Sequence, residues 1–143
     1  MICGDMIAPC GLNCALCSQA LLKENPCKGC LGPDEGKPAY CISGCKIITC
    51  KERENMSVSY CDACPRYPCS QMLERETRYA NAYPMVESPI GNLAYIRQQG
   101  MESFLRREQE RWSCSVCGGI ICVHTGVCAG CGKKHSINPV RQD

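Results

Sequence analysis

Residues 10–30 read CGLNCALCSQALLKENPCKGC, and the two C-x2-C pairs in this stretch decide how the first half of the chain folds. A C-x2-C turn presents two thiolates to one metal ion, and a second such turn completes a tetrahedron of sulfur ligands. We therefore expect one metal ion here, with a short helix over residues 15–22 between the two pairs. The expected ligands are Cys14, Cys17, Cys27 and Cys30.

A second cysteine-rich stretch follows at residues 41–69, CISGCKIITCKERENMSVSYCDACPRYPC. Its six cysteines exceed the four that one zinc ion needs. We expect a second metal site on Cys45, Cys50, Cys61 and Cys64. Cys69 competes for one of these places, and the roles of Cys10 and Cys41 stay open.

Iron–sulfur chemistry is the alternative for this first half. Cys64-Pro65 resembles the C-P end of a ferredoxin run, although the full ferredoxin spacing is absent. Cys10, Cys14 and Cys17 also have the C-x3-C-x2-C spacing of radical S-adenosylmethionine enzymes. That reading is disfavoured because the alternating strand and helix pattern of a large barrel is missing.

The C-terminal stretch 114–135, CSVCGGIICVHTGVCAGCGKKH, has zinc-ribbon spacing, C-x2-C-x10-C-x2-C. The expected ligands are Cys114, Cys117, Cys128 and Cys131. Gly118 and Gly132 follow the two pairs and permit the positive φ that turns backbone N–H groups toward thiolates. Apolar residues on both sides of the turn at 124–126 predict two hairpin strands. We expect His124 and His135 at the surface, because four thiolates already fill the coordination shell.

Residues 70–112 contain no cysteine and have helical periodicity. We expect a helix from a Ser70 cap to Tyr83, a second from Ser88-Pro89 to Gly100, and a third over residues 101–112. Their apolar faces are typical of a core and not of a cofactor site. The expected organisation is a cysteine-rich metal-binding module at 1–69, a helical segment packed on it at 70–112, and a zinc ribbon at 113–143.

Composition indicates that apolar burial alone does not hold this fold. Leu, Ile, Val and Phe number 25 of 143 residues, below the roughly 20% at which an ordinary core becomes doubtful. The 17 cysteines supply the alternative, as disulfides or as metal ligands. We favour metal ligands over disulfides, and with them a reduced, cytoplasmic protein. The reasons are the odd number of cysteines, their C-x2-C pairs and the lack of a signal-peptide pattern. We therefore expect a small, metal-stabilised α+β fold with an irregular zinc-knuckle half, a helical middle and a terminal ribbon.

Charge and motif content narrow the function classes. The formal net charge is +2, and three zinc ions on four thiolates each would shift it to roughly −4. The basic residues near the ribbon are Arg106, Arg107, Arg111, Lys133, Lys134 and Arg141. Glu108 and Glu110 are interleaved with them, which indicates a solvated helix surface. Nucleic acid is therefore the disfavoured partner. No stretch approaches the roughly 18–20 apolar residues of a membrane span.

Catalytic patterns are missing from the chain. It has no H-E-x-x-H, P-loop or G-x-G-x-x-G motif, and its two histidines offer little general-base chemistry. Sites with four thiolate ligands are closed and structural. We expect a zinc protein with three ions that acts as a non-enzymatic binding or adaptor module for a protein partner. An iron–sulfur electron carrier or redox sensor is the alternative, and an enzyme that uses a metal with an open position is the third hypothesis.

The cysteine motifs resemble one known family. The matching words are APCGLNCALC, CKGC, CKIITC, CDACPRYPCSQML and RWSCSVCG. They resemble the prokaryotic proteins grouped as domain of unknown function 3795, over nearly the whole chain. The resemblance implies an intracellular, cysteine-rich, zinc-binding protein with no established activity. This chain departs from the pattern by adding Cys3, Cys41 and Cys122, so the pairing around Cys41 and Cys45 stays open.

Overall fold

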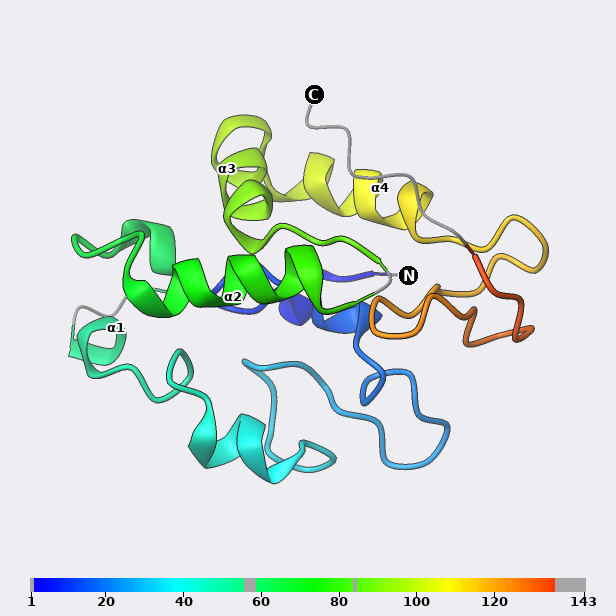
Figure 1. Cartoon of the computed structure of the whole chain (residues 1–143), viewed down its shortest axis with the longest axis horizontal. Helices are drawn as coiled ribbons and strands as arrows, with labels where there is room; N and C mark the ends of the chain where they lie inside the picture. The colour runs from blue at the N-terminus through cyan, green and yellow to red at the C-terminus, as the bar shows by residue number, and fades with distance from the viewer. Residues whose placement is uncertain (1, 56–58, 84, 136–143) are drawn as a thin grey trace.

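The computed structural model describes residues 2–55, 59–83 and 85–135, which form short helices joined by long irregular loops (Figure 1). Within these ranges, β-structure consists of isolated antiparallel bridges. The predicted α+β class is therefore corrected to a mixture of helix and coil. The predicted hairpin strands of the C-terminal stretch are reduced to single bridges, for a reason given with the metal centre below.

The helical middle follows the expected pattern. The α-helices among the described residues are α1 (Lys51–Asn55), α2 (Ser70–Asn81), α3 (Pro89–Gln99) and α4 (Met101–Arg111), and a π-helix at Tyr40–Gly44 precedes them. Ser88 caps α3, because its hydroxyl accepts a hydrogen bond of 2.9 Å from the Gly91 N–H. Gly100 separates α3 from α4 with a φ of 89°, in the region that favours glycine. The three helices predicted for residues 70–112 are thus confirmed. The predicted Ser70 cap is wrong, because Ser70 is the first residue of α2 and the preceding Cys69 makes no side-chain capping hydrogen bond.

The short helix predicted for residues 15–22 is wrong. The chain forms only a 3-10 turn at Cys14–Leu16, in which the Asn13 side chain accepts from the Ala15 N–H at 3.1 Å. Leu16 is fully buried, and its carbonyl accepts a 2.9 Å hydrogen bond from the Val123 N–H. This long-range bond occupies a carbonyl that a continuing helix would use internally.

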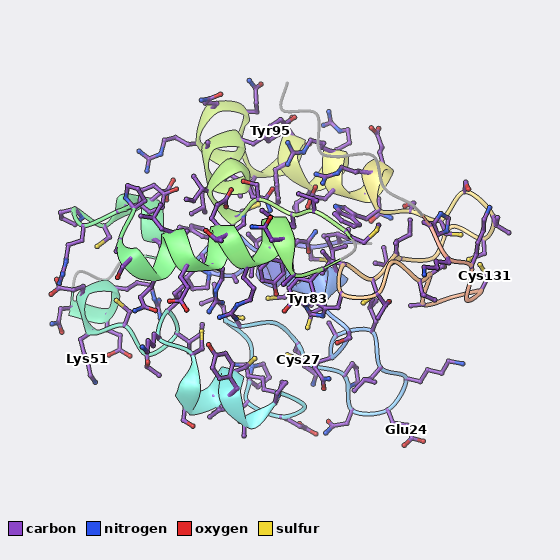
Figure 2. All side chains as sticks on the ribbon, viewed as in Figure 1. Glu24, Cys27, Lys51, Tyr83, Tyr95 and Cys131 are labelled. Atoms are coloured by element: carbon purple, nitrogen blue, oxygen red, sulfur yellow. The ribbon has the colours of Figure 1, made fainter. Side chains whose placement is uncertain are left out.

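The helices pack in sequence order. In Figure 1, α3 and α4 lie along one side of α2, and α3 contacts both of its neighbours. The loops that hold Cys27 extend on the other side of α2 (Figure 2). Within the described ranges, none of the helices combines the length and apolar character needed to cross a bilayer.

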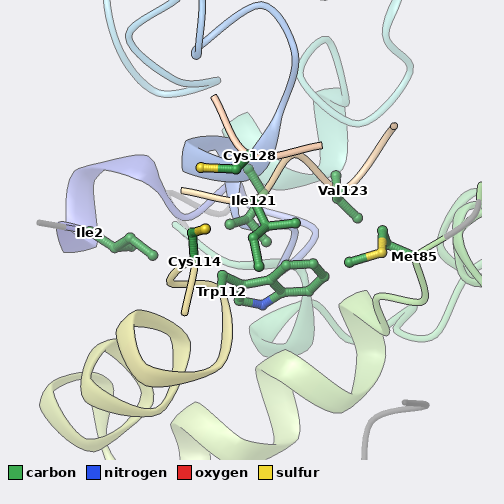
Figure 3. Close-up of a cluster of buried hydrophobic side chains, with 8 residues drawn as sticks. Ile2, Met85, Trp112, Cys114, Ile121, Val123 and Cys128 are labelled. Atoms are coloured by element: carbon green, nitrogen blue, oxygen red, sulfur yellow. The ribbon is translucent and has the colours of Figure 1, made fainter. Parts of the chain in front are cut away.

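Two apolar clusters form the core. The first surrounds the fully buried Trp112 (Figure 3); its other members are Ile2, Leu16, Met85, Cys114, Ile121, Val123 and Cys128. This Trp112 cluster takes residues from all three predicted segments, so these segments share a core. The second, called here the Met72 cluster, consists of Ala8, Cys10, Leu12, Cys45, Ile47, Met72 and Leu93. Cysteines are members of both clusters, which links the thiols to the packing of the whole chain.

A buried polar network joins the N-terminal loop to α3 and α4. Glu87 accepts hydrogen bonds from the Asn13 backbone N–H at 2.8 Å and from Asn92 Nδ2 at 3.1 Å. Asn13 Nδ2 donates to Glu108, which lies 3.6 Å from Arg111. Burial raises the pKa of Glu87 to about 8. Glu108 is fully buried, so the solvated helix surface predicted for it is wrong. No local pattern predicts this network, because its members lie far apart in the chain.

Candidate metal centre

The C-terminal cysteines converge as the sequence predicts. The Sγ atoms of Cys114, Cys117, Cys128 and Cys131 all lie within 4.8 Å of one another. Two of the separations are 3.4 Å (Cys117 to Cys128) and 3.7 Å (Cys114 to Cys131). A tetrahedral zinc ion with Zn–S bonds of about 2.3 Å separates its sulfur ligands by about 3.8 Å. The four sulfurs are therefore spaced for one tetrahedral metal ion.

Each cysteine pair sits on a tight turn closed by the glycine that follows it. Gly118 donates to the Cys114 carbonyl at 2.9 Å, and Gly132 donates to the Cys128 carbonyl at 3.0 Å. Their φ angles are 76° and 78°, so the predicted role of these glycines is confirmed. The turns aim backbone N–H groups at sulfur, for example Gly130 N at 3.3 Å from Cys128 Sγ.

These N–H groups favour thiolates. Hydrogen bonds from the Cys117 and Val116 backbone help lower the pKa of Cys114 to about 7. Those from the Cys131 and Gly130 backbone lower the pKa of Cys128 to about 6. The Gly119 N–H lowers the pKa of Cys117, but the neighbouring sulfurs of Cys128 and Cys131 outweigh it and raise the value to about 11. Four thiolates this close repel one another, and a bound cation removes that penalty.

Two further glycines let the turns approach each other. A Cβ at Gly119 would lie 2.9 Å from Cys128 Sγ and 3.2 Å from Cys117 Sγ. A Cβ at Gly130 would lie 3.0 Å from Cys117 Sγ. Both positions therefore require glycine for space, whereas Gly118 and Gly132 require it for backbone conformation. The sequence predicted only Gly118 and Gly132; Gly119 and Gly130 flank ligand cysteines in the words Cys-Gly-Gly and Ala-Gly-Cys.

The predicted hairpin is replaced by single bridges because successive residues bond to different parts of the chain. The bridges are Ser113–Ile120, Ile121–Cys128 and Val127–Lys134. Ile121 N donates to the Trp112 carbonyl, Cys122 N to Val127, and Val123 N to Leu16. Three partners for three consecutive residues prevent a continuous ladder.

Neither histidine is the plain surface residue that was expected. His135 Nε2 lies 3.3 Å from Cys114 Sγ, beside the four sulfurs. His124 is half-buried, and burial lowers its pKa. Its Nδ1 accepts from the Ser18 backbone N–H at 3.3 Å, which assigns the ring proton to Nε2, 3.2 Å from the Tyr79 hydroxyl. His124 thus connects the C-terminal stretch to the N-terminal loop and to α2.

The predicted ligands of the first half are less closely gathered. Cys14 Sγ and Cys30 Sγ lie 3.4 Å apart. Among the residues that the structure describes, however, the C-terminal quartet is the group of three or more metal-binding side chains that converges within 4.8 Å. The remaining assignments stay predictions; they concern Cys14, Cys17, Cys27, Cys30, Cys45, Cys50, Cys61, Cys64 and Cys69.

The chain was compared with family models, curated proteins and solved structures, and no match was found in any of the three. The assignment of the C-terminal site therefore depends on its own geometry: four convergent sulfurs, backbone donors aimed at them, and glycines where a side chain would not fit.

Proposed function

We propose that this chain is a zinc protein in which Cys114, Cys117, Cys128 and Cys131 hold a structural ion, and that it acts as a non-enzymatic binding or adaptor module. The observation that carries this proposal is the convergence of four cysteine sulfurs within 4.8 Å. Tetrahedral sites with four sulfur ligands are typical of zinc or iron–sulfur centres, and closed four-thiolate zinc sites are structural. Thiolate ligands require a reducing compartment, so we place the protein in the cytoplasm.

The surface beside the site supports a protein partner over nucleic acid. Val116 lies at the tip of the first cysteine turn and is 64% exposed. Two of the basic residues near the ribbon already have partners within the chain. The Arg107 guanidinium stacks 4.0 Å from the Tyr95 ring centroid, and Arg111 forms an ion pair with Glu108. Arg141 lies outside the described residues. The likeness to the prokaryotic domain of unknown function 3795 is consistent with this role and stays a prediction.

The test is metal analysis of the full chain purified without oxygen. We expect Cys117→Ser/Cys131→Ser to contain one zinc ion per chain fewer than the parent, because both thiols are exposed ligands of one ion. Ser115→Ala, in the same turn, should keep the parent content. Equal zinc content in all three proteins would refute the site. Iron together with visible absorption, which zinc does not give, would favour the iron–sulfur alternative.

The closed character of the site is tested with Co²⁺ in place of zinc. A tetrahedral four-thiolate cobalt site should give intense visible bands that do not change when azide is added, because no coordination position is open. A spectrum that shifts with azide would indicate an open position, and with it a catalytic metal.

A further inference from the structure

The starting point is a small polar hollow beside α2, called here the α2 hollow. Its volume is about 70 Å³, and each side chain that lines it carries a polar group; the lining residues are Tyr40, Lys46, Gln71, Glu74, Arg75 and Arg78. One bound water needs only about 10–15 Å³ of such space, whereas sites for drug-sized ligands have about 300–1,000 Å³. The α2 hollow therefore suits a ligand group of a few atoms and not a whole cofactor.

The α2 hollow has two walls, and a contact with a buried residue connects them. One wall is a single face of α2, because its four lining residues follow the i, i+3, i+4, i+7 spacing of a helix face. The other wall consists of Lys46 and of Tyr40, at the start of the π-helix that lies beside α2 (Figure 1). Cys45, next to Lys46, is 3% exposed, and its Sγ accepts from Arg75 Nη2 at 3.5 Å. This contact sets the position of the two walls relative to each other.

The α2 hollow has an excess of positive charge. Its cations are Lys46, Arg75 and Arg78, and its acid is Glu74, so the formal charge of the lining is +2. None of the three cations belongs to an ion pair with a carboxylate found among the described residues. Glu74 and Arg78 stand at i, i+4, the spacing at which such pairs form, yet they do not form one. The chain itself therefore does not neutralise this charge.

The two arginines of the α2 hollow differ from the other arginines that the structure describes. Arg53 donates to two backbone carbonyls, and the rest pair with carboxylates; these are Arg66, Arg97, Arg106, Arg107 and Arg111. Arg75, by contrast, donates to a thiol, and its Nε is buried without a hydrogen-bond partner. A guanidinium partly removed from water is destabilised unless an anion lies beside it. The arginines without such a partner meet at the same small hollow, which indicates an anion site.

We propose that the α2 hollow binds the dianionic phosphate group of inorganic phosphate or of a phosphate monoester, with Lys46, Arg75 and Arg78 as the cationic donors. Arginine and lysine are the usual partners of phosphate oxygens, and the charge of about −1.5 to −2 on a monoester at pH 7 balances the lining. The hydroxyl of Tyr40 and the amide of Gln71 offer neutral donors. A diester carries a single negative charge, so a nucleic-acid backbone is the poorer fit.

The first test is isothermal titration calorimetry of the zinc-loaded full chain with inorganic phosphate at constant ionic strength. Lys46→Gln/Arg78→Gln should bind phosphate at least tenfold more weakly than the parent; both residues are exposed, so the fold should be kept. Lys23→Gln/Lys133→Gln removes the same charge at exposed positions that do not line the α2 hollow and should stay within about threefold. Equal weakening in both double variants, or a parent that binds no phosphate, would overturn the proposal.

The phosphate site goes beyond the proposed zinc function and is measured apart from it. The zinc content of the same three proteins is determined before each titration. Equal zinc content together with unequal phosphate affinity would support the α2 hollow whatever the outcome at the C-terminal site. Either proposal can therefore fail without the other.

Two further titrants identify the source and the charge of the phosphate group. Blocked phosphoserine presents a monoester, and dimethyl phosphate presents a diester. Tighter binding of inorganic phosphate would assign the free ion as the ligand, and tighter binding of blocked phosphoserine would assign a phosphate ester. Dimethyl phosphate should bind at least tenfold more weakly than the better of the two. A diester that binds as tightly as both would overturn the assignment to a dianion.

Glu74 allows a test in the opposite direction, because its carboxylate repels a phosphate group in the α2 hollow. Glu74→Gln should bind inorganic phosphate at least threefold more tightly than the parent. Glu110→Gln makes the same change of charge at an exposed position of α4 and should stay within about twofold. Unchanged affinity in Glu74→Gln would place the phosphate away from the α2 hollow and overturn the proposal.

Chemical modification locates the site without any variant. Phenylglyoxal modifies accessible guanidinium groups, and each arginine of the parent is scored by mass spectrometry with and without inorganic phosphate. Phosphate should slow the modification of Arg78 at least fivefold and leave the rate at Arg66, which is also exposed, unchanged. Chloride at equal ionic strength should protect neither residue. Equal rates at Arg78 with phosphate and with chloride would overturn the proposal.

Discussion

At the residue scale, the C-terminal site depends on how closely two backbone turns approach each other. Gly119 and Gly130 stand where the sulfurs of the opposite pair leave no space for a Cβ. The ligands themselves follow from spacing, but the affinity of the site depends on these neighbours.

The first prediction concerns Gly119→Ala. The new Cβ would lie 2.9 Å from Cys128 Sγ, so the turns must separate and the zinc geometry must distort. We expect zinc affinity to fall by at least tenfold, consistent with an overpacking cost of about 1–3 kcal/mol. Competition with a zinc chelator measures it. Gly4→Ala is the matched control, because its Cβ would meet side chains only at an ordinary 3.7 Å; equal affinities for both variants would contradict the prediction.

The second prediction concerns Glu87, whose pKa burial raises from 4.5 to about 8. In this pH range the folded state binds more protons than the unfolded state, so the free energy of unfolding falls as pH rises from about 5 to 8. Glu87→Gln mimics the protonated carboxyl and should remove this part of the slope. Near pH 8 we expect the free energy of unfolding of the variant to exceed that of the parent by a few kcal/mol. This follows because each unit of pKa shift corresponds to roughly 1.4 kcal/mol.

Urea unfolding of both proteins at several pH values, with equal zinc content, checks this prediction. The difference between the two proteins isolates Glu87, because thiol titration contributes equally to both. A difference that stays constant with pH would show that Glu87 does not titrate in this range.

At the scale of elements, α3 depends on local signals at both ends. Ser88 caps the first turn and Pro89 occupies the first helical position, while Gly100 ends the helix. The Ser88 hydroxyl also donates to Glu76 Oε1 at 2.5 Å, which connects α3 to α2. One serine therefore starts a helix and holds it against its neighbour.

The third prediction is that Ser88→Ala lowers the free energy of unfolding by about 1–2 kcal/mol, since it removes the cap and a charge-assisted hydrogen bond. Ser88→Thr retains the hydroxyl and should recover most of this loss. Thermal unfolding followed by circular dichroism measures both. A threonine variant as unstable as the alanine variant would show that the hydroxyl is not the stabilising group.

At the scale of the whole molecule, metal and core are connected. Cys114 and Cys128 are ligands of the candidate zinc ion and also members of the Trp112 cluster. That cluster takes residues from the N-terminal loop, the helical segment and the C-terminal stretch (Figure 3). Because apolar residues are scarce in this chain, metal removal should affect more than the C-terminal turns.

The fourth prediction follows from this connection. Trp112 is the single tryptophan of the chain and is fully buried, so its fluorescence reports on the shared core. Chelation of zinc under reducing conditions should shift its emission to longer wavelength and abolish near-ultraviolet circular dichroism. Added zinc should restore both signals. Unchanged emission after complete zinc removal would show that the core is independent of the metal.

The sequence by itself determined the features that depend on residues close to one another in the chain. The capping signals at Ser88 and Gly100 define α3, and the spacing of the C-terminal cysteines brings four sulfurs together across a short loop. Both results depend on bonds and turns formed within a few residues, which local stereochemistry controls.

The tertiary structure decided the features that need distant partners. Glu87 meets Asn13 across 74 residues, and no local pattern marks either side chain. The Leu16 carbonyl accepts a hydrogen bond from the Val123 N–H instead of one within a helix. The predicted helix is therefore replaced by a turn. In the first half, Cys10 and Cys45 are buried members of the Met72 cluster, and Cys14 and Cys30 pack against it. The physical reason is that burial and charge compensation depend on which surfaces the whole chain brings together.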